Sequence, residues 1–210
     1  MSLPAIRSLS IRHTVADAIR QALRQGQFQP GENLNEVGLA TEFQISRGPV
    51  REALLVLTQE GLLTHSPNRG FSVLHFTAKD RAQIDDVRLL LETRALELGR
   101  ERLTPEDAAH LEKLKKELVA RFHPEQLAAR DAAEMAFHSF IWELSGNPWL
   151  VSSLRSTMLP YFTYSRPFGL IESTLAPELA TERHQLYVEY LRKKTSKSAR
   201  ECVAFHLGIG

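Results

Sequence analysis

The chain has 210 residues, of which 43% are hydrophobic and 24% charged, a composition typical of a globular protein with one large or two small domains. Lys and Arg total 26 against 25 acidic residues, so the formal charge of +1 gives no overall sign of a polyanionic partner. Cys202, the single cysteine, excludes an internal disulfide, and no apolar run approaches the roughly 20 residues that span a bilayer, so we expect a cytoplasmic protein without a membrane anchor.

Two short helices are predicted near the start of the chain. Residues 15–23 repeat apolar side chains at helical spacing, and the turn residues at 26–31 stop the pattern, which predicts a helix ending near Gln25. A second helix is expected to follow Asn35 as its N-cap and to run to Phe43.

The stretch from residue 46 to residue 57 predicts a third helix. Ser46 is expected to cap it by accepting a hydrogen bond from a first-turn amide, and Pro49 is tolerated in that turn. Arg47 and Arg51, four residues apart, share one face. The opposite face is apolar and carries Val50, Ala53, Leu54 and Leu57. Two short helices joined by a tight turn are typical of a helix-turn-helix.

A β-hairpin is predicted directly after this helix. Gly61 suits the left-handed position that ends a helix. Residues 62–65 and 70–76 indicate two short strands around a polar tip at 66–69. A β-hairpin that directly follows a helix-turn-helix is called a wing.

Residues 11 to 76 therefore resemble the winged helix-turn-helix of GntR-family bacterial transcription regulators, which implies a DNA-binding domain over residues 1–76. The matching residues are Pro30-Gly31, Leu34, Glu36, Leu39-Ala40, the run Ser46-Arg47-x-Pro49-Val50-Arg51-Glu52-Ala53-Leu54, Glu60-Gly61-Leu62 and Arg69-Gly70. The resemblance implies that the third helix and the wing contact DNA through Arg47, Gly48, Pro49, Arg51, Arg69 and Gly70, with His65 assisting.

The chemistry of the guanidinium group supports DNA contact by the arginines of this helix. A guanidinium can donate two hydrogen bonds to guanine O6 and N7 in the major groove. The structural alternative for Arg47 and Arg51 is a solvated helix face beside Glu52. One departure from the pattern is Val37, which stands where a family member known for direct readout has an arginine, so that contact should be absent.

Residues 77–210 predict a second, all-α domain, an antiparallel helical bundle, so the expected fold class is mainly α. A first long helix should end near Arg102, with a buried face of Ile84, Val87, Leu91, Ala95 and Leu98. Further helices are expected at about 104–122, 124–144, 149–166, 177–194 and 196–207.

Histidines give this second domain its chemistry. Glu134 and His138 are four apart and project from the same face of one helix. His184 and His206 lie on the last two helices, at a separation suited to an antiparallel pair. Three imidazoles and a carboxylate are a site for a transition metal, zinc or nickel. Asp131 is an alternative carboxylate but lies about 10.5 Å from His138 along the helix axis.

A second resemblance rests on these residues, to the FCD effector domain of the FadR-like subfamily of GntR regulators. The matching residues are Arg88-x-x-x-Glu92, Phe137-His138, Ser145-Gly146-Asn147, Glu182-x-His184 and His206-Leu207. In metal-binding members the family pattern is Asp-x-x-x-His followed by two further histidines, which implies metal ligation by Glu134, His138, His184 and His206. Glu134 departs from the usual Asp and would shift the ion or ligate it from another rotamer.

Arg88 should point into the bundle, where a buried guanidinium needs an anionic partner. The sequence leaves two partners open: Glu92, four residues further on, or the carboxylate of a ligand bound beside the metal.

The two resemblances together cover nearly the whole chain and imply a homodimeric, DNA-binding transcriptional regulator, a repressor released by a small carboxylate effector, on a palindromic operator. One alternative is the same kind of regulator without a metal. Another is a metal-dependent hydrolase, but no accompanying nucleophile or second carboxylate motif is found, so we expect no enzyme.

Overall fold

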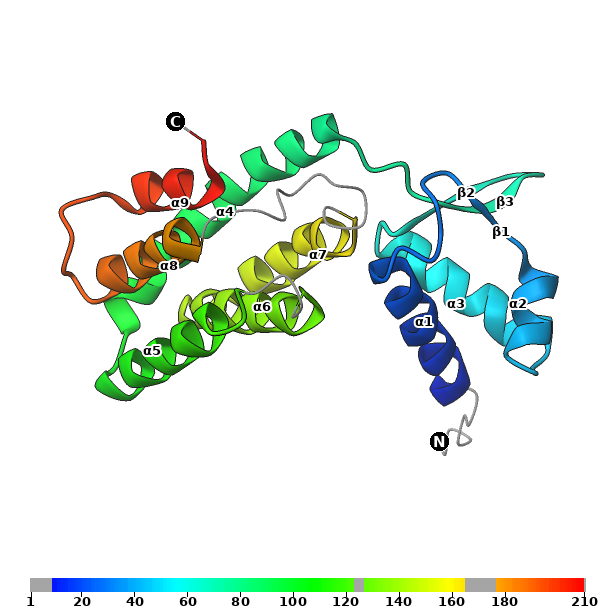
Figure 1. The fold of residues 1–210 in the computed structure, drawn as a ribbon, viewed down its shortest axis with the longest axis horizontal. Helices are drawn as coiled ribbons and strands as arrows, with labels where there is room; N and C mark the ends of the chain where they lie inside the picture. The colour runs from blue at the N-terminus through cyan, green and yellow to red at the C-terminus, as the bar shows by residue number, and fades with distance from the viewer. Residues whose placement is uncertain (1–8, 123–126, 165–176, 210) are drawn as a thin grey trace, which may run out of the picture. The chain divides into compact units, whose positions relative to one another are not determined.

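The computed structural model of the protein describes residues 9–122, 127–164 and 177–209 (Figure 1). Its elements in chain order are α1 (Leu9–Arg24), β1 (Asn33–Leu34), α2 (Glu36–Glu42), α3 (Arg47–Gln59), β2 (Leu63–Ser66), β3 (Gly70–Val73), α4 (Ala78–Arg102), α5 (Pro105–Val119), α6 (Leu127–Leu144), α7 (Pro148–Tyr164), α8 (Pro177–Leu191) and α9 (Ala199–Leu207). The expected fold class, a winged helix-turn-helix followed by a helical domain, is confirmed.

The described residues form two compact units. The first comprises those up to Arg81 together with the end of α7 from Leu159, and the second comprises the rest of α4 and α7 with the helices between and after them. Helices α4 and α7 therefore each have residues in both units. The division of the sequence into domains at residue 76 stays a prediction.

In the first unit, three helices pack with a small antiparallel sheet of strand order β1-β3-β2 (Figure 1). β2 and β3 form the predicted wing, with Leu63 opposite Val73 and Ser66 opposite Gly70. β1 was not predicted, because two residues are too few to show an alternating pattern. It pairs Asn33 with Ser72 on β3.

The core of this unit comes from the apolar faces that the helical spacing predicts. α1 contributes Val15, Ala16, Ile19 and Leu23, and α3 contributes Val50, Ala53, Leu54 and Leu57, all buried. Arg20 of α1 also donates two hydrogen bonds to Glu60 at the end of α3, with Nη2 2.8 Å from Oε2 and Nε 3.2 Å from the same oxygen. Burial of these side chains fixes the orientation of α3 and leaves its other face to solvent.

The end of α7 packs into the same unit. The hydroxyl of Tyr164 donates to the carbonyl of Leu62 just before β2, and its ring centroid lies 6.2 Å from that of Phe76. Tyr164 is fully buried there. Burial raises the pKa of this hydroxyl far above its usual value, so it remains a hydrogen-bond donor.

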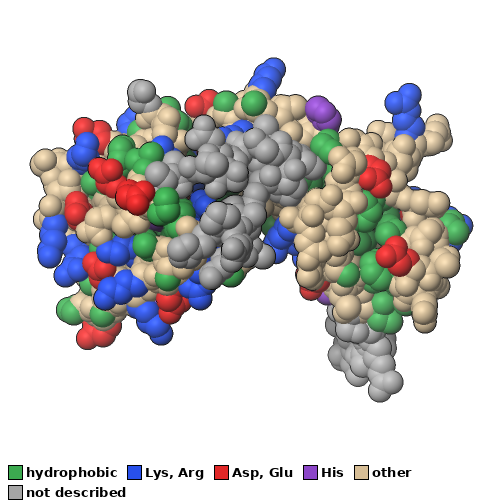
Figure 2. Space-filling view, in the orientation of Figure 1, with side chains coloured by type: hydrophobic (Ala, Val, Ile, Leu, Met, Phe, Trp, Pro, Cys, Tyr) green, Lys and Arg blue, Asp and Glu red, His purple; other side chains and the backbone are tan. Residues whose placement is uncertain are grey.

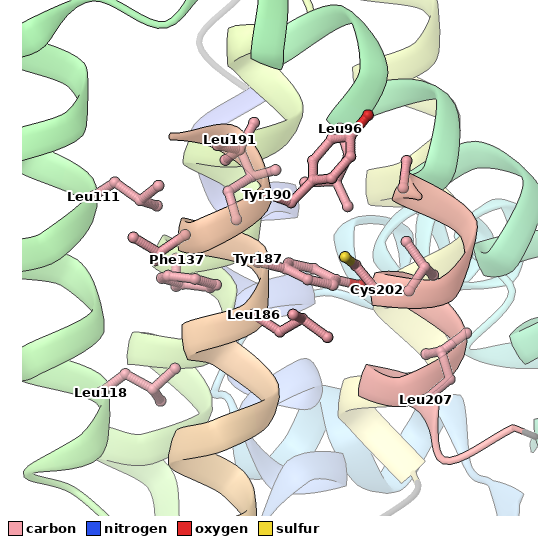
Figure 3. Close-up of a cluster of buried hydrophobic side chains, with 14 of the residues drawn as sticks. Leu96, Leu111, Leu118, Phe137, Leu186, Tyr187, Tyr190, Leu191, Cys202 and Leu207 are labelled. Carbon is pink, nitrogen blue, oxygen red and sulfur yellow. The ribbon is translucent and has the colours of Figure 1, made fainter. Parts of the chain in front are cut away.

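The second unit is built from helices alone among its described residues. Its core joins Leu96 of α4, Leu111 and Leu118 of α5, and Phe137 of α6 to buried side chains of α8 and α9. Figure 3 shows Tyr187 pointing from α8 toward Cys202 of α9. α9 begins at Ala199 rather than at the expected 196, because Ser198 and Glu201 form a capping box.

The expected buried face of α4 needs a correction. Val87 is 43% exposed and its neighbour Leu90 is 65% exposed. Ala95 is buried as expected, and the rest of the buried face carries Asp85, Arg88, Leu89, Glu92, Leu96 and Gly99. Three of these side chains are charged. A pattern of apolar residues at helical spacing cannot reveal charged residues that are buried as ion pairs.

On the face drawn in Figure 2, basic and acidic side chains are interspersed over the helices α5, α8 and α9. Within the helical unit, Glu112 lies 2.8 Å from Lys115 and 3.0 Å from Arg192. This mixture agrees with the formal charge of +1. None of the described helices combines the length and the apolar character needed to cross a membrane.

Candidate functional site

The third helix, α3, begins at Arg47 as predicted, with Ser46 in an extended conformation before it. The predicted cap is wrong in one respect, since the Ser46 side chain accepts no hydrogen bond from the first turn. Ser46 is exposed, so water can satisfy these amides instead. By contrast, Asn35 caps α2 as expected, with its Oδ1 3.0 Å from the amide nitrogen of Val37.

Arg47 and Arg51 are both exposed on the face of α3 opposite the core. Among the residues that the structure describes, no atom lies within 4 Å of a Cβ built at Gly48, so the backbone of the first turn is accessible there. Pro49 is partly buried. Val37, on the first turn of α2, is 52% exposed and offers only methyl groups, as the sequence led us to expect.

Arg51 has a partner that the sequence did not suggest. Its Nη1 donates to Oε1 of Glu36 on α2 at 3.1 Å, whereas Glu52 was the neighbour considered. The Arg51 side chain keeps 54% of its surface exposed, against 16% for Glu36. Because a guanidinium has five N–H donors, this ion pair orients Arg51 and leaves donors for another partner.

The wing places its predicted residues at an exposed tip. His65 and Arg69 are exposed, and the His65 ring centroid lies 4.5 Å from that of Phe71. Gly70 has a φ of +75°, which side chains with a Cβ rarely adopt, and a Cβ there would meet nothing within 4 Å. The tip is thus shaped for close approach to another surface.

A second site lies in the helical unit, where three helices bring the predicted metal ligands together. α6 carries Glu134 and His138, α8 carries His184, and α9 carries His206. One nitrogen from each histidine lies within 4.8 Å of the other two. The ring centroids are 4.7 Å apart for His138 and His206 and 4.9 Å apart for His184 and His206. We call these four residues the histidine cluster.

A hydrogen bond to the backbone fixes the orientation of the His184 ring. Its Nδ1 donates to the carbonyl of Ala180 at 2.6 Å, which directs Nε2 into the cluster, 2.9 Å from Oε2 of Glu134. The same carboxylate oxygen lies 3.5 Å from Nε2 of His138. A backbone carbonyl that fixes the tautomer of an imidazole is a usual support of a metal-ligating histidine.

Charges in the cluster are strongly coupled. Burial opposes ionisation of Glu134, but the neighbouring His184 and His138 outweigh it and hold the pKa of Glu134 well below its usual range. Burial likewise opposes protonation of His184, yet Glu134 raises the pKa of His184. Burial, His138 and His184 together lower the pKa of His206 well below its usual value, so its imidazole stays neutral with a lone pair available.

The donor set fits a transition metal. The Nδ1 atoms of His138 and His206 are buried, and neither has a hydrogen-bond partner among the described residues. Imidazole and carboxylate donors suit zinc and its neighbours. Glu134 is the carboxylate that meets two of the histidines, and it would have to exchange these contacts for the ion.

Arg88 is buried, and its charge is balanced within α4. Its Nε donates to Glu92 at 2.8 Å and its Nη1 to Asp85 at 3.1 Å. Glu92 also accepts from the hydroxyl of Tyr187 at 3.0 Å and lies 3.7 Å from Nδ1 of His138. Of the two partners left open by the sequence, the structure shows Glu92. A role for Arg88 in binding an effector stays a prediction.

Residues 11–73 match the bacterial regulatory proteins of the gntR family, and residues 83–208 match the FCD domain. The chain belongs to the GntR family. It is a DNA-binding transcriptional regulator with an FCD domain, and its family and relatives are regulators rather than enzymes. The hydrolase alternative is therefore not supported.

Similar proteins extend over most of this GntR-family chain. The HTH-type transcriptional regulator YdhC of Bacillus subtilis is 29% identical over 192 residues, which are 90% of this chain and 84% of that protein. The gluconate operon transcriptional repressor of the same species is 30% identical, over 86% of this chain and 75% of the repressor. The solved structure of E. coli McbR/YncC aligns with a TM-score of 0.71 at 27% identity, over 94% of this chain and 93% of that one.

Proposed function

We propose that this regulator binds a transition metal, zinc or nickel, through His138, His184, His206 and Glu134, and that a small carboxylate bound beside the metal controls its affinity for DNA. The observation that carries the proposal is the convergence of three imidazoles from three helices within 4.8 Å. The support of His184 by the carbonyl of Ala180 is a second reason.

In this proposal, a metal held by the histidine cluster would act as a Lewis acid for a carboxylate oxygen. The chain's own residues do the rest: α6, α8 and α9 each hold one imidazole, and Glu134 offsets part of the positive charge. A ligand bound at the metal would therefore link helices that are distant in sequence. It changes DNA affinity only as far as it binds one arrangement of the protein more tightly than another.

We also propose which residues contact DNA. The exposed Arg47 and Arg51, with Gly48 and Pro49, would contact the major groove, and the wing residues Arg69 and Gly70, with His65 beside them, would contact the neighbouring minor groove. We propose a homodimer in the cytoplasm, with one recognition helix in each half of a palindromic operator. Repression is favoured because a relative is named a gluconate operon repressor.

Substitution of Arg51 tests the DNA surface. Arg51→Ala should weaken binding to DNA from near the protein's own gene at least tenfold and reduce the dependence of affinity on salt. Fluorescence anisotropy over a salt series measures both quantities. Arg94→Ala is a matched control, because Arg94 is 60% exposed on α4 and pairs with Glu97. Equal affinities for the two variants would contradict the proposed role of Arg51.

Substitution of two histidines tests the metal. His184→Ala combined with His206→Ala should abolish stabilisation of the untagged protein by zinc, while DNA binding is largely kept. The control is His110→Ala, since His110 is exposed and its ring meets that of Phe140 edge to face, with the ring centroids 4.7 Å apart. Thermal unfolding with and without zinc, together with elemental analysis, gives the result.

A regulator of the same class without a metal is the alternative outcome. In that case zinc would not raise the unfolding temperature of the wild type, and elemental analysis would find no stoichiometric metal. The effector would then be held by other groups of the helical unit.

A further inference from the structure

A buried hydrogen-bond donor without an acceptor lies beside the histidine cluster. Trp142 is fully buried on α6, and its indole Nε1 has no hydrogen-bond partner among the described residues. The indole N–H is the only polar group of a tryptophan side chain, and it can donate but not accept. Burying such a donor without an acceptor is unfavourable, so a native fold that does so needs a reason.

The position of Trp142 places this donor at the edge of the cluster. Glu134, His138 and Trp142 follow one another at intervals of four residues, so they project from the same face of α6. The Trp142 ring centroid lies 6.1 Å from that of His138, with 34° between the ring planes. Trp142 therefore continues, by one turn toward the C-terminus of α6, the row of side chains that carries the predicted metal ligands.

Other donors around the cluster already have acceptors. Nδ1 of His184 donates to a backbone carbonyl at 2.6 Å. The hydroxyl of Tyr187 donates to Glu92 at 3.0 Å, and Arg88 donates to the same carboxylate at 2.8 Å. Trp142 differs from these three residues, because the part of the chain that the structure describes offers its N–H no acceptor.

A metal ion would not satisfy Trp142. An ion can take up unpaired nitrogens of His138 and His206, because a neutral imidazole offers a lone pair. An indole N–H offers none. The metal-loaded cluster would therefore still need an acceptor atom beside Trp142. A carboxylate that is bound through one oxygen has a second oxygen free to accept.

We propose that the indole N–H of Trp142 donates a hydrogen bond to the carboxylate of the effector, and that Trp142 thereby selects ligands that keep an acceptor oxygen when they are bound. This inference rests on the proposed metal and carboxylate function. It gives Trp142 a part in recognition beyond its packing in the helical unit. A hydrogen bond to a charged acceptor is stronger than one between neutral groups.

The two tryptophans of the chain allow a direct test by NMR. In protein labelled at the indole nitrogen of tryptophan, each indole N–H gives its own signal, and Trp149, which is 83% exposed, is the internal reference. The variant Trp149→Phe assigns the two signals. Acetate is titrated into the zinc-loaded full chain at constant ionic strength. The indole proton of Trp142 should move to higher chemical shift, as a proton does when it gains a hydrogen bond, while that of Trp149 stays in place.

Two substitutions measure the strength of the contact. Trp142→Phe keeps an aromatic ring but removes the donor, so the zinc-loaded variant should need about tenfold more acetate than wild type for the same rise in unfolding temperature. Zinc alone should stabilise variant and wild type equally. Trp149→Phe is the matched control and should leave both responses unchanged, because Trp149 is exposed in the first turn of α7.

Equal acetate responses in Trp142→Phe and wild type, or an acetate response without movement of the Trp142 signal, would overturn this inference and leave the proposed metal and carboxylate site standing. A Trp142 signal that is already at a hydrogen-bonded position before acetate, and stays there, would also overturn it, by indicating buried water as the partner. No acetate response in the zinc-loaded wild type would overturn the carboxylate part of the proposed function together with this inference. If Trp142→Phe does not fold, the NMR titration of the wild type still decides.

Discussion

At the scale of single residues, Cys202 shows how burial sets reactivity. The thiol lies on α9 in the helical core and is fully buried. Desolvation is the main reason that the pKa of Cys202 is raised to about 11, since burial disfavours the thiolate. The thiolate is the reactive form of cysteine.

Cys202 should therefore resist alkylation in the folded protein. At pH 8 the raised pKa keeps the thiol protonated, so iodoacetamide should modify native protein at least about a hundredfold more slowly than protein unfolded in urea, because thiolate fraction falls about tenfold for each pH unit below the pKa and burial limits access as well. Mass spectrometry over time measures the rate. Comparable rates in the two states would show that the α9 region opens readily.

At the scale of elements, α3 combines two requirements in one short helix. Its buried face holds it in the first unit, and its first turn exposes Arg47 and Gly48. Glycine weakens a helix relative to alanine by roughly 0.5–1 kcal/mol. An open glycine at this position costs stability but leaves the backbone accessible.

Gly48→Ala should separate these two effects. The added Cβ would meet no atom of the described residues within 4 Å, so the free energy of unfolding should rise by up to about 1 kcal/mol. If DNA approaches the first turn, as we propose, the methyl group should lower DNA affinity about tenfold, or ~1.4 kcal/mol. Urea unfolding and anisotropy measure the two quantities. Unchanged DNA affinity would place the contact elsewhere.

At the scale of the whole molecule, α7 is the helix whose end joins the first unit. Tyr164 attaches it there through the carbonyl of Leu62 and through its contact with Phe76. The carbonyl of Leu62 also accepts from the amide of Leu74 at 3.3 Å, so it keeps a partner if the tyrosine hydroxyl is removed.

Tyr164→Phe should loosen this attachment without breaking the fold. A lost hydrogen bond of this kind should lower the free energy of unfolding by about 1 kcal/mol. Hydrogen exchange should increase in the last turn of α7 and in β2 together, with α6 unaffected. Faster exchange in α7 alone would indicate that the hydroxyl does not hold these elements together.

Periodicity and turn residues were enough to predict most elements of this protein. The apolar face of α3 and the glycine at its end are local features, because helical spacing and positive φ depend on neighbours in sequence. Motifs with fixed spacing were enough for the GntR and FCD assignment, which residues 11–73 and 83–208 confirm. The predicted buried face of α4 was wrong at Val87, because three of the side chains that are buried there, Asp85, Arg88 and Glu92, are charged.

Only the tertiary structure decided which side chains meet. The sequence could nominate His138, His184 and His206, but their approach within 4.8 Å depends on how α6, α8 and α9 pack. It gave no sign that Arg51 pairs with Glu36, 15 residues away on another helix. Contacts between helices depend on packing angles and burial, which no local pattern encodes. For that reason the sequence by itself determined the family and the helices, while the neighbours of each charge came from the fold.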